Sequence, residues 1–284
     1  MSQHIIHPLS QPPGSGPPIG AHFTFSEGQF ADRMIRAELH ELQKADIGRK
    51  YTHKDRRSLD PPPVVQLKLF EIVDSTSATE TEIADYKAVE IAGLLCHVDL
   101  FAVRSTPQAD AGHSIPLRPG TSRVLSISSS PLDAGVHATT NATQSEVLTH
   151  VNGHRITEQS ICTTALVGST VIEATSLERE GSDTLMYTFS VCPFSVCVSI
   201  VPAVRSRTHL SMDLSVRQEG TFILRYRVFD TVSMARGSES VPVLAECYGG
   251  PFEIFPTKLF PGLRPSTELT RARSLCKLFL TCLS

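Results

Sequence analysis

The segment GTFILRYRVFD, residues 220–230, alternates between large apolar side chains and other residues. The apolar positions of one face are Phe222, Leu224, Tyr226 and Val228. Successive residues of a strand point to opposite faces of a sheet, so this pattern predicts a strand with one face buried and with Arg225 and Arg227 on the other face. One strand cannot bury its apolar face alone, and the chain must therefore supply further strands to cover it.

Several other segments are candidate strands. Val65, Leu67 and Leu69 alternate with polar residues directly after three prolines, which force an extended backbone. Further candidates lie within residues 93–103 (GLLCHVDLFAV), 165–177 (ALVGSTVIEATSL) and 249–263 (GGPFEIFPTKLFPGL). Short strands with polar connections, in a chain that lacks Trp, predict a mainly all-β fold of the β-sandwich type with a minor helix.

Residues 30–48 fit two patterns. Ile35, Leu39 and Leu42 have helical spacing, whereas Ile35, Ala37 and Leu39 also alternate as in a strand. The sequence by itself favours a helix here.

Two other regions lack a sustained periodic pattern of apolar residues. Residues 1–30 begin with a Pro-, Gly- and Ser-rich stretch and are predicted to be a flexible tail. Residues 104–164 are polar and are predicted to be a largely unstructured insertion. The N-terminus does not resemble a secretory signal, and seven irregularly spaced cysteines do not form a disulfide framework, so we expect a protein inside the cell.

The most uneven charge in the chain lies just before the three prolines. Between residues 49 and 57 there are five cations and one acid, Asp55, so this window carries +4 while the whole chain carries −3. The cations are Arg49, Lys50, Lys54, Arg56 and Arg57. A local excess of this size suggests a site for an anionic partner.

Three blocks of sequence, in this order, resemble the signature blocks of the velvet domain of fungal regulators. They are KDRRSLDPPPVVQLKL, DLSVRQEGTFILRYRVFD and PFEIFPTKLFPGLRPSTELTRA. The resemblance covers residues 31–272, and it is interrupted by the 104–164 insertion and by residues 191–212, which are atypical of the family. Residues 191–212 are either a family-specific insertion or retained intron sequence, and residues 273–284 form an atypical C-terminal tail.

The resemblance implies an immunoglobulin-like sandwich related to the Rel-homology DNA-binding fold, with a strand rather than a helix at residues 35–43. It also implies a nuclear regulator, able to shuttle to the cytoplasm, that controls development, sporulation and secondary metabolism as a homodimer or a heterodimer with another velvet protein. Its expected DNA contacts in this sequence are Arg49, Lys50, Lys54, Arg56 and Arg57.

Other cations are weaker candidates for the same interface. Arg217 and Lys258 lie in the signature blocks, and Arg225 and Arg227 on the outward face of their strand could extend a basic surface. Ion pairing of these arginines with Glu219 or with a neighbouring strand is an equally good interpretation. Ile223 and Phe229, also predicted to point outward, suggest a face that a partner covers.

Two further classes of function stay open beside DNA binding. The chain could be a velvet subunit that binds proteins but does not itself read DNA, or an unrelated β-sandwich binding module. The sequence contains no nucleophile elbow, phosphate-binding glycine loop or zinc-protease motif, so we expect neither an enzyme nor a cofactor or metal site. We also expect no small-molecule substrate. We expect no membrane segment, because the most apolar run, residues 191–204, contains two prolines and is too short to span a bilayer.

Overall fold

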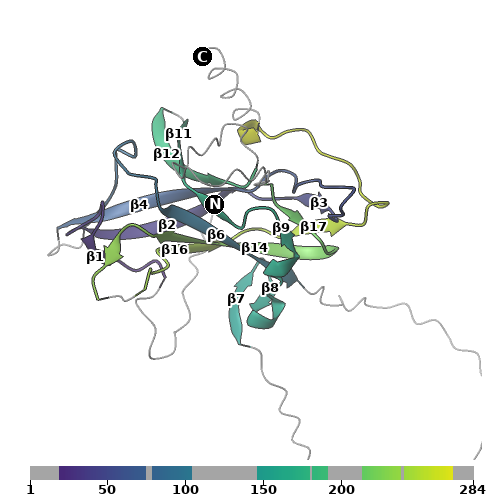
Figure 1. The fold of residues 1–284 in the computed structure, drawn as a ribbon, viewed down its shortest axis with the longest axis horizontal. Helices are drawn as coiled ribbons and strands as arrows, with labels where there is room; N and C mark the ends of the chain where they lie inside the picture. The colour runs from purple at the N-terminus through teal and green to yellow at the C-terminus, as the bar shows by residue number, and fades with distance from the viewer. Residues whose placement is uncertain are drawn as a thin grey trace, which may run out of the picture.

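A computed structural model describes residues 19–74, 79–103, 146–179, 181–190, 213–237 and 240–270. Two large sheets dominate it (Figure 1). The seven-stranded sheet contains β1 (Phe23–Glu27), β2 (Met34–Gln43), β4 (Val64–Asp74), β5 (Thr79–Glu82), β11 (Thr175–Arg179), β12 (Ser182–Thr188) and β15 (Met234–Ala235). The six-stranded sheet contains β3 (Ile47–Arg49), β6 (Leu94–Val103), β10 (Val171–Glu173), β14 (Gly220–Asp230), β16 (Ala245–Tyr248) and β17 (Phe252–Phe255). The predicted all-β sandwich is confirmed.

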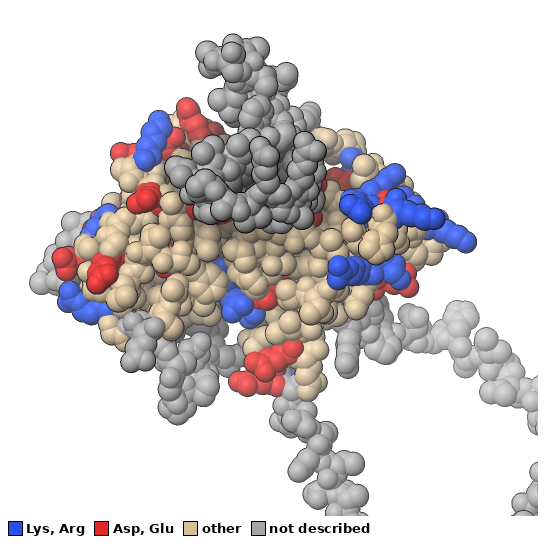
Figure 2. All heavy atoms as spheres, viewed as in Figure 1, with Lys and Arg blue, Asp and Glu red and all other residues tan. Residues whose placement is uncertain are grey.

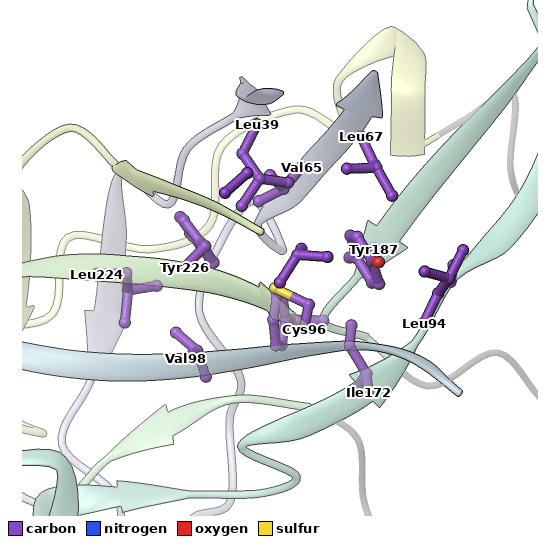
Figure 3. Close-up of a cluster of buried hydrophobic side chains, with 14 of the residues drawn as sticks. Leu39, Val65, Leu67, Leu94, Cys96, Val98, Ile172, Tyr187, Leu224 and Tyr226 are labelled. Atoms are coloured by element: carbon purple, nitrogen blue, oxygen red, sulfur yellow. The ribbon is translucent and has the colours of Figure 1, made fainter. Parts of the chain in front are cut away.

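The core lies between the two sheets. Figure 3 shows Leu39, Val65 and Tyr187 of the seven-stranded sheet facing Val98 and Tyr226 of the six-stranded sheet. All five side chains are buried, and they belong to one continuous apolar cluster. Because a buried aliphatic or aromatic side chain contributes roughly 1.5–3 kcal/mol, this cluster is the main source of stability for the sandwich.

The strand β14 is the centre of the six-stranded sheet, as its alternation predicts. Phe222, Leu224, Tyr226 and Val228 are buried, and the strand pairs along its whole length with β6. β17 pairs with its first residues and β16 with later ones. The clearest sequence pattern therefore marks a central strand with three partner strands.

Residues 34–43 form the strand β2, so the helical interpretation of this segment is wrong and the strand implied by the family resemblance is confirmed. Ile35, Ala37 and Leu39 are buried on the core face, whereas Arg36 and Glu38 lie on the other face. β2 is hydrogen-bonded to β1 on one side and to β4 on the other. The segment forms a strand because pairing on both sides satisfies the hydrogen-bonding groups of its backbone and buries every second side chain on the same face.

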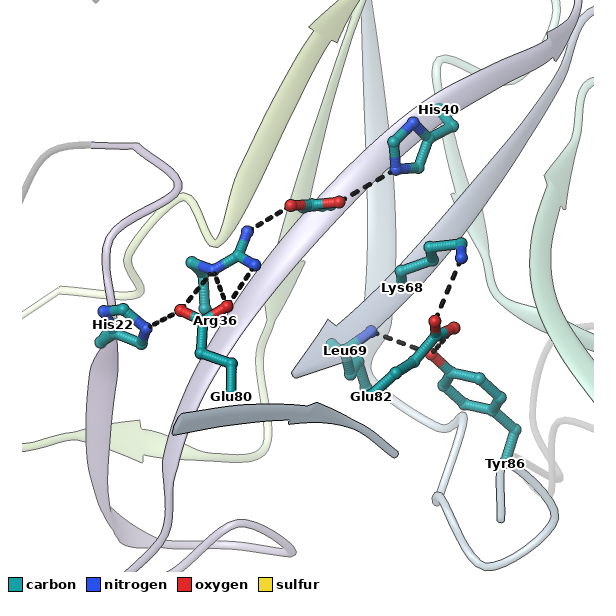
Figure 4. A network of polar contacts seen from close by, with 9 residues as sticks. His22, Arg36, His40, Lys68, Leu69, Glu80, Glu82 and Tyr86 are labelled. Carbon is teal, nitrogen blue, oxygen red and sulfur yellow. Dashed lines mark hydrogen bonds and ion pairs between the residues drawn. The ribbon is translucent and has the colours of Figure 1, made fainter. Parts of the chain in front are cut away.

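Charged side chains cross the outer face of the seven-stranded sheet (Figure 4). Arg36 on β2 donates hydrogen bonds to Glu80 on β5 and to Glu38, and Glu80 also contacts His22. The hydrogen bond from Arg36 lowers the pKa of the Glu80 carboxyl to about 2. Opposite charges therefore pair with one another across the outer face of this sheet.

The predicted unstructured insertion is wrong for its last part. Residues 146–164 contain a hairpin, β7 (Val147–Val151) and β8 (His154–Thr157), followed by the 3-10 turn η1 (Glu158–Ser160) and the start of a second, η2 (Thr163–Ala165). Asn152 and Gly153 both have positive φ, 49° and 80°, as the tight turn of a two-residue hairpin requires. The structure of residues 104–145 lies outside the described part of the chain.

The hairpin covers the outward face of β14. Ile156 of β8 packs with Phe101 and Val103 of β6 and with Ile223, and all four are buried. The expectation that Ile223 is exposed for a partner to cover is wrong, because the chain covers this residue itself. Phe229 is half-buried.

Two other boundaries differ from the sequence predictions. The predicted flexible tail contains the strand β1, which pairs with β2 and β15, whereas residues 1–18 lie outside the described part. The segment 165–177 forms three short strands, β9 (Leu166–Val167), β10 and the start of β11, in three different sheets. Gly168 separates the first two: its φ is +111°, and an added Cβ would lie 2.2 Å from the carbonyl oxygen of Asp213. Residues 191–212 and 271–284 are also outside the described part.

Candidate nucleic-acid interface

Arg49 is the last residue of β3, and the other four cations of residues 49–57 lie on the loop between β3 and β4, which is fixed at both ends. β3 pairs in parallel with β17, so both strands end at the same end of the sandwich. The amide of Lys50 donates to the carbonyl of Phe255 at 2.9 Å, and the amide of Tyr51 donates to that of Val216 at 2.7 Å. On the other side, the amide of Leu59 donates to the carbonyl of Leu214 at 2.8 Å. Two separate parts of the fold therefore hold this loop.

The tip of the loop is a tight turn. The amide of Thr52 donates to the carbonyl of Asp55 at 2.9 Å, and the amide of Asp55 donates back to the Thr52 carbonyl and hydroxyl, each at 3.1 Å. His53 and Lys54 form the exposed tip, and Arg56 and Arg57, which follow it, are also exposed. The turn directs several cations away from the sandwich.

Asp55 divides the five cations into two groups. Its carboxylate lies 2.7 Å from Nε of Arg49, and the two side chains are only 18–19% exposed. Nε of Arg57 is 3.6 Å from the same carboxylate, but 52% of the Arg57 side chain is exposed. Within the described residues, Lys50, Lys54 and Arg56 have no acidic partner within 4.0 Å. Arg49 is thus held in a largely buried ion pair, whereas Lys54, Arg56 and Arg57 are exposed and Lys50 is partly exposed.

Arg217 and Lys258 lie at the same end as the loop. Arg217 follows β13 (Ser215–Val216), whose Val216 accepts the hydrogen bond from Tyr51, so it borders the loop directly. Lys258 lies beyond β17. Both side chains are exposed, and Figure 2 shows Lys and Arg gathered at this end of the molecule. The structure therefore brings all seven predicted DNA-contact residues to one end of the sandwich.

Arg225 and Arg227 are not part of this surface. Nη2 of Arg225 lies 2.7 Å, and Nη2 of Arg227 lies 3.0 Å, from Oδ2 of Asp99 on β6. The Arg225 guanidinium also stacks over the Phe101 ring at 5.1 Å. Burial of Asp99 opposes its ionisation, but the hydrogen bond from Arg225 and the charge of Arg227 outweigh burial and hold the pKa of Asp99 below its usual value. Ion pairing with a neighbouring strand, one of the two interpretations, is confirmed.

Arg264 is a cation of this end that is absent from the residues predicted from the sequence. Its Nη1 lies 3.3 Å from Oδ2 of Asp46, and its amide donates to Oδ2 of Asp60 at 3.3 Å. Two-thirds of its side chain is exposed. Its position directly after FPGL in the third signature block is the signal that could have identified it.

The described residues do not suggest a metal centre or a membrane segment. No group of three His, Cys, Asp or Glu side chains in this part of the chain is placed to hold a metal ion. None of the helices within the described ranges has the length and apolar character needed to cross a membrane. The three cysteines in these ranges, Cys96, Cys162 and Cys247, are free thiols.

Comparisons with known proteins agree with the signature blocks. The sequence model of the family described as Velvet factor matches residues 37–274. A probable velvet family sexual development regulator of Laccaria bicolor is 42% identical over 268 residues, which cover 89% of this chain and 71% of that protein. Another, of Schizophyllum commune, is 36% identical over 280 residues, covering 95% of this chain and 83% of that protein.

A shorter match links the chain to a protein named for an assembly. Velvet complex subunit 2 of Gibberella moniliformis is 40% identical over 65 residues, which cover 21% of this chain and 14% of that protein. The family match and the two long relatives together span both sheets of the sandwich and the loop at its end. This chain belongs to the velvet family of regulators.

Proposed function

We propose that this protein is a transcriptional regulator that binds double-stranded DNA through the loop of residues 49–57. The observation that carries the proposal is a set of cations on a loop fixed at both ends, of which Lys54, Arg56 and Arg57 are exposed and Lys50 is partly exposed. A fixed loop loses little conformational freedom on binding, so more of the attraction between cations and phosphates appears as affinity.

The two kinds of cation have different roles in this proposal. Lys50 and Lys54 carry compact charges that suit phosphate oxygens, which position the protein without reading the sequence. Arg56 and Arg57 carry planar guanidinium groups that can donate two hydrogen bonds to one guanine in the major groove. Arg49 instead holds Asp55 in the turn, so its role is to position the loop.

The names of the long relatives, both sexual development regulators, support a role in fungal development. We extend the proposal to sporulation and secondary metabolism, which the family resemblance implies. The protein would act in the nucleus, with shuttling to the cytoplasm, and by binding rather than by catalysis.

Replacing Lys54 by Ala removes one positive charge from the loop and tests whether the loop contacts DNA. Each phosphate contact contributes about −0.9 to the slope of log affinity against log salt, so Lys54→Ala is expected to reduce the slope by about one unit. The matched control is Lys87→Ala, which removes the same charge from an exposed lysine that pairs with Asp183 at 3.2 Å. Fluorescence anisotropy with a random-sequence duplex gives both slopes. Equal effects of the two variants would mean that net charge, and not this loop, determines binding.

A second candidate function is that of a protein-interaction subunit whose partner reads the DNA. The name of the Gibberella moniliformis relative, a velvet complex subunit, favours it. The two roles are compatible if the chain forms a homodimer, or a heterodimer with another velvet protein, and we propose such a dimer.

Light scattering of the chain alone and mixed with other velvet proteins of the same organism tests the dimer. The expected result is a mass of two chains in at least one of these samples. If this chain keeps the mass of a monomer, 31.0 kDa, in every sample, the result would count against the dimer and the subunit role together.

A further inference from the structure

The connection between β3 and β4, which contains residues 50–57, is called the basic loop. The two most exposed large apolar side chains within the described residues lie beside it. Leu259 is 71% exposed and Leu263 is 62% exposed, whereas the other exposed large apolar residues of this part are 43–54% exposed. Apolar side chains gathered in solvent commonly mark an interaction surface. The segment that carries them, residues 256–264, follows β17.

This segment runs alongside the basic loop. It leaves β17 at Phe255, whose carbonyl accepts the hydrogen bond from Lys50, and it ends at Arg264, whose amide donates to Asp60. Both ends of residues 256–264 are thus tied to the two ends of the basic loop. The two segments project from the same end of the sandwich (Figure 1).

The segment has a defined conformation that separates its apolar residues. The ring of Phe260 lies 6.5 Å from that of Phe255, so Phe260 faces the fold. The amide of Leu259 donates to the carbonyl of Pro256 at 2.9 Å, which closes a turn before it. Gly262 has a φ of +101° and turns the chain again before Leu263. Internal contacts therefore account for Phe260 but leave the two leucines in solvent.

The charges around the leucines identify the kind of partner. Lys258 precedes Leu259 and Arg264 follows Leu263, and both cations are exposed. Duplex DNA offers phosphates for such cations, and next to them it offers thymine methyl groups and base faces for apolar side chains. Arg264 already pairs with Asp46, but Lys258 has no acidic partner within 4.0 Å among the described residues, and an apolar protein surface would leave its charge uncompensated. Charge complementarity therefore favours DNA.

We propose that Leu259 and Leu263 contact the bases of the DNA that the basic loop holds, and that they add sequence preference to binding. This inference rests on the proposed function. Leucine carries no charge and displaces no counterions, so its contribution should not depend on salt, unlike that of the loop cations. Sequence preference and salt dependence can consequently be separated by mutation.

The test uses the full chain and a duplex enriched from a random pool by the wild-type protein. Affinity is measured for this duplex and for a scrambled duplex of equal composition, at several salt concentrations. The double variant Leu259→Ser/Leu263→Ser is expected to lower the ratio of the two affinities about 5-fold or more, the effect of one mismatched base pair, and to keep the wild-type salt slope. Thermal melting checks that the fold is retained.

The control is Val232→Ser/Met234→Ser, which removes two exposed apolar residues beyond the far end of β14. It should change neither the affinity ratio nor the slope. An unchanged ratio in the leucine variant, or a wild-type chain that binds with the expected slope but enriches no sequence, would overturn the inference while the proposed function stands. Loss of association with another velvet chain at an unchanged ratio would assign the leucines to a protein contact and also overturn it. A wild-type chain with no salt-dependent DNA binding would refute the proposed function itself.

Discussion

Asp99→Ala is expected to lower the free energy of unfolding by about 3–5 kcal/mol, the usual cost of removing one partner from a buried ion pair. Asp99 is 6% exposed, and its Oδ2 accepts hydrogen bonds from Nη2 and Nε of Arg225 at 2.7 and 3.1 Å. Arg227 shares the same oxygen at 3.0 Å. The variant leaves two guanidinium groups against the sheet without their common counter-ion. Urea denaturation measures the loss.

Arg236→Ala is the control for this prediction. It breaks an ion pair with Asp32 at 3.3 Å in which both side chains are largely exposed. Exposed pairs contribute about 0–1 kcal/mol, so this variant should unfold at nearly the wild-type urea concentration. If Asp99→Ala also costs less than about 1 kcal/mol, water and Glu246, whose carboxylate lies 3.6 Å from Nη1 of Arg225, compensate the two arginines, and the pairing with Asp99 is not a structural element.

The sequence predicts strands well where one face is buried and strand partners lie on both sides. β14 and β4 follow this rule, and their alternation marks the residues that face the core between the sheets, although it misses Ile223, which is buried on the other face of β14. The helical prediction for β2 fails because Glu, Leu, Gln and Lys in this segment all favour helices. Pairing with β1 and β4 overrides that local preference, and only the family resemblance indicates it.

The prediction that residues 104–164 are unstructured misses the β7–β8 hairpin for a different reason. Its surroundings are polar, and their composition outweighs the local signal. Asn152-Gly153 between two short runs with β-branched residues is a strong local indication of a two-residue hairpin, and it identifies the turn. That the hairpin covers Ile223 depends on contacts between residues far apart in the chain, which no local pattern contains.

The position of the basic loop is predictable from the sequence, but the state of its charges is not. The run of cations before three prolines indicates an exposed loop, and the signature blocks place it at the end of a sandwich. Which cation pairs with Asp55 depends on the turn closed by Thr52, and Arg49 rather than Lys54 meets the carboxylate. Arg264 is held at this end by contacts with Asp46 and Asp60, which lie about 200 residues away in the chain and which no local pattern contains.

Replacing Lys50, Lys54, Arg56 and Arg57 together by Ala is expected to weaken DNA binding at least about 100-fold. One base-reading arginine alone contributes roughly 1–3 kcal/mol, and the two lysines remove further phosphate contacts. Arg49 and Asp55 remain, so the turn and its hydrogen bonds to β13 and β17 should persist. An unchanged melting temperature is the control, because exposed substitutions of this kind usually change stability by less than about 0.5 kcal/mol.

A salt titration of the wild-type chain beside this quadruple variant tests the central claim most directly. The phosphate contacts of Lys50 and Lys54 predict that the logarithm of the wild-type affinity for duplex DNA falls with the logarithm of salt concentration, and that the loop contributes about −1.8 to this slope. The variant should bind weakly. Its slope should be small, because only Arg217, Lys258 and Arg264 remain at this end to contact phosphates. If both proteins bind with the same affinity and the same slope, the loop of residues 49–57 is only a solvated surface, and DNA binding through it is refuted.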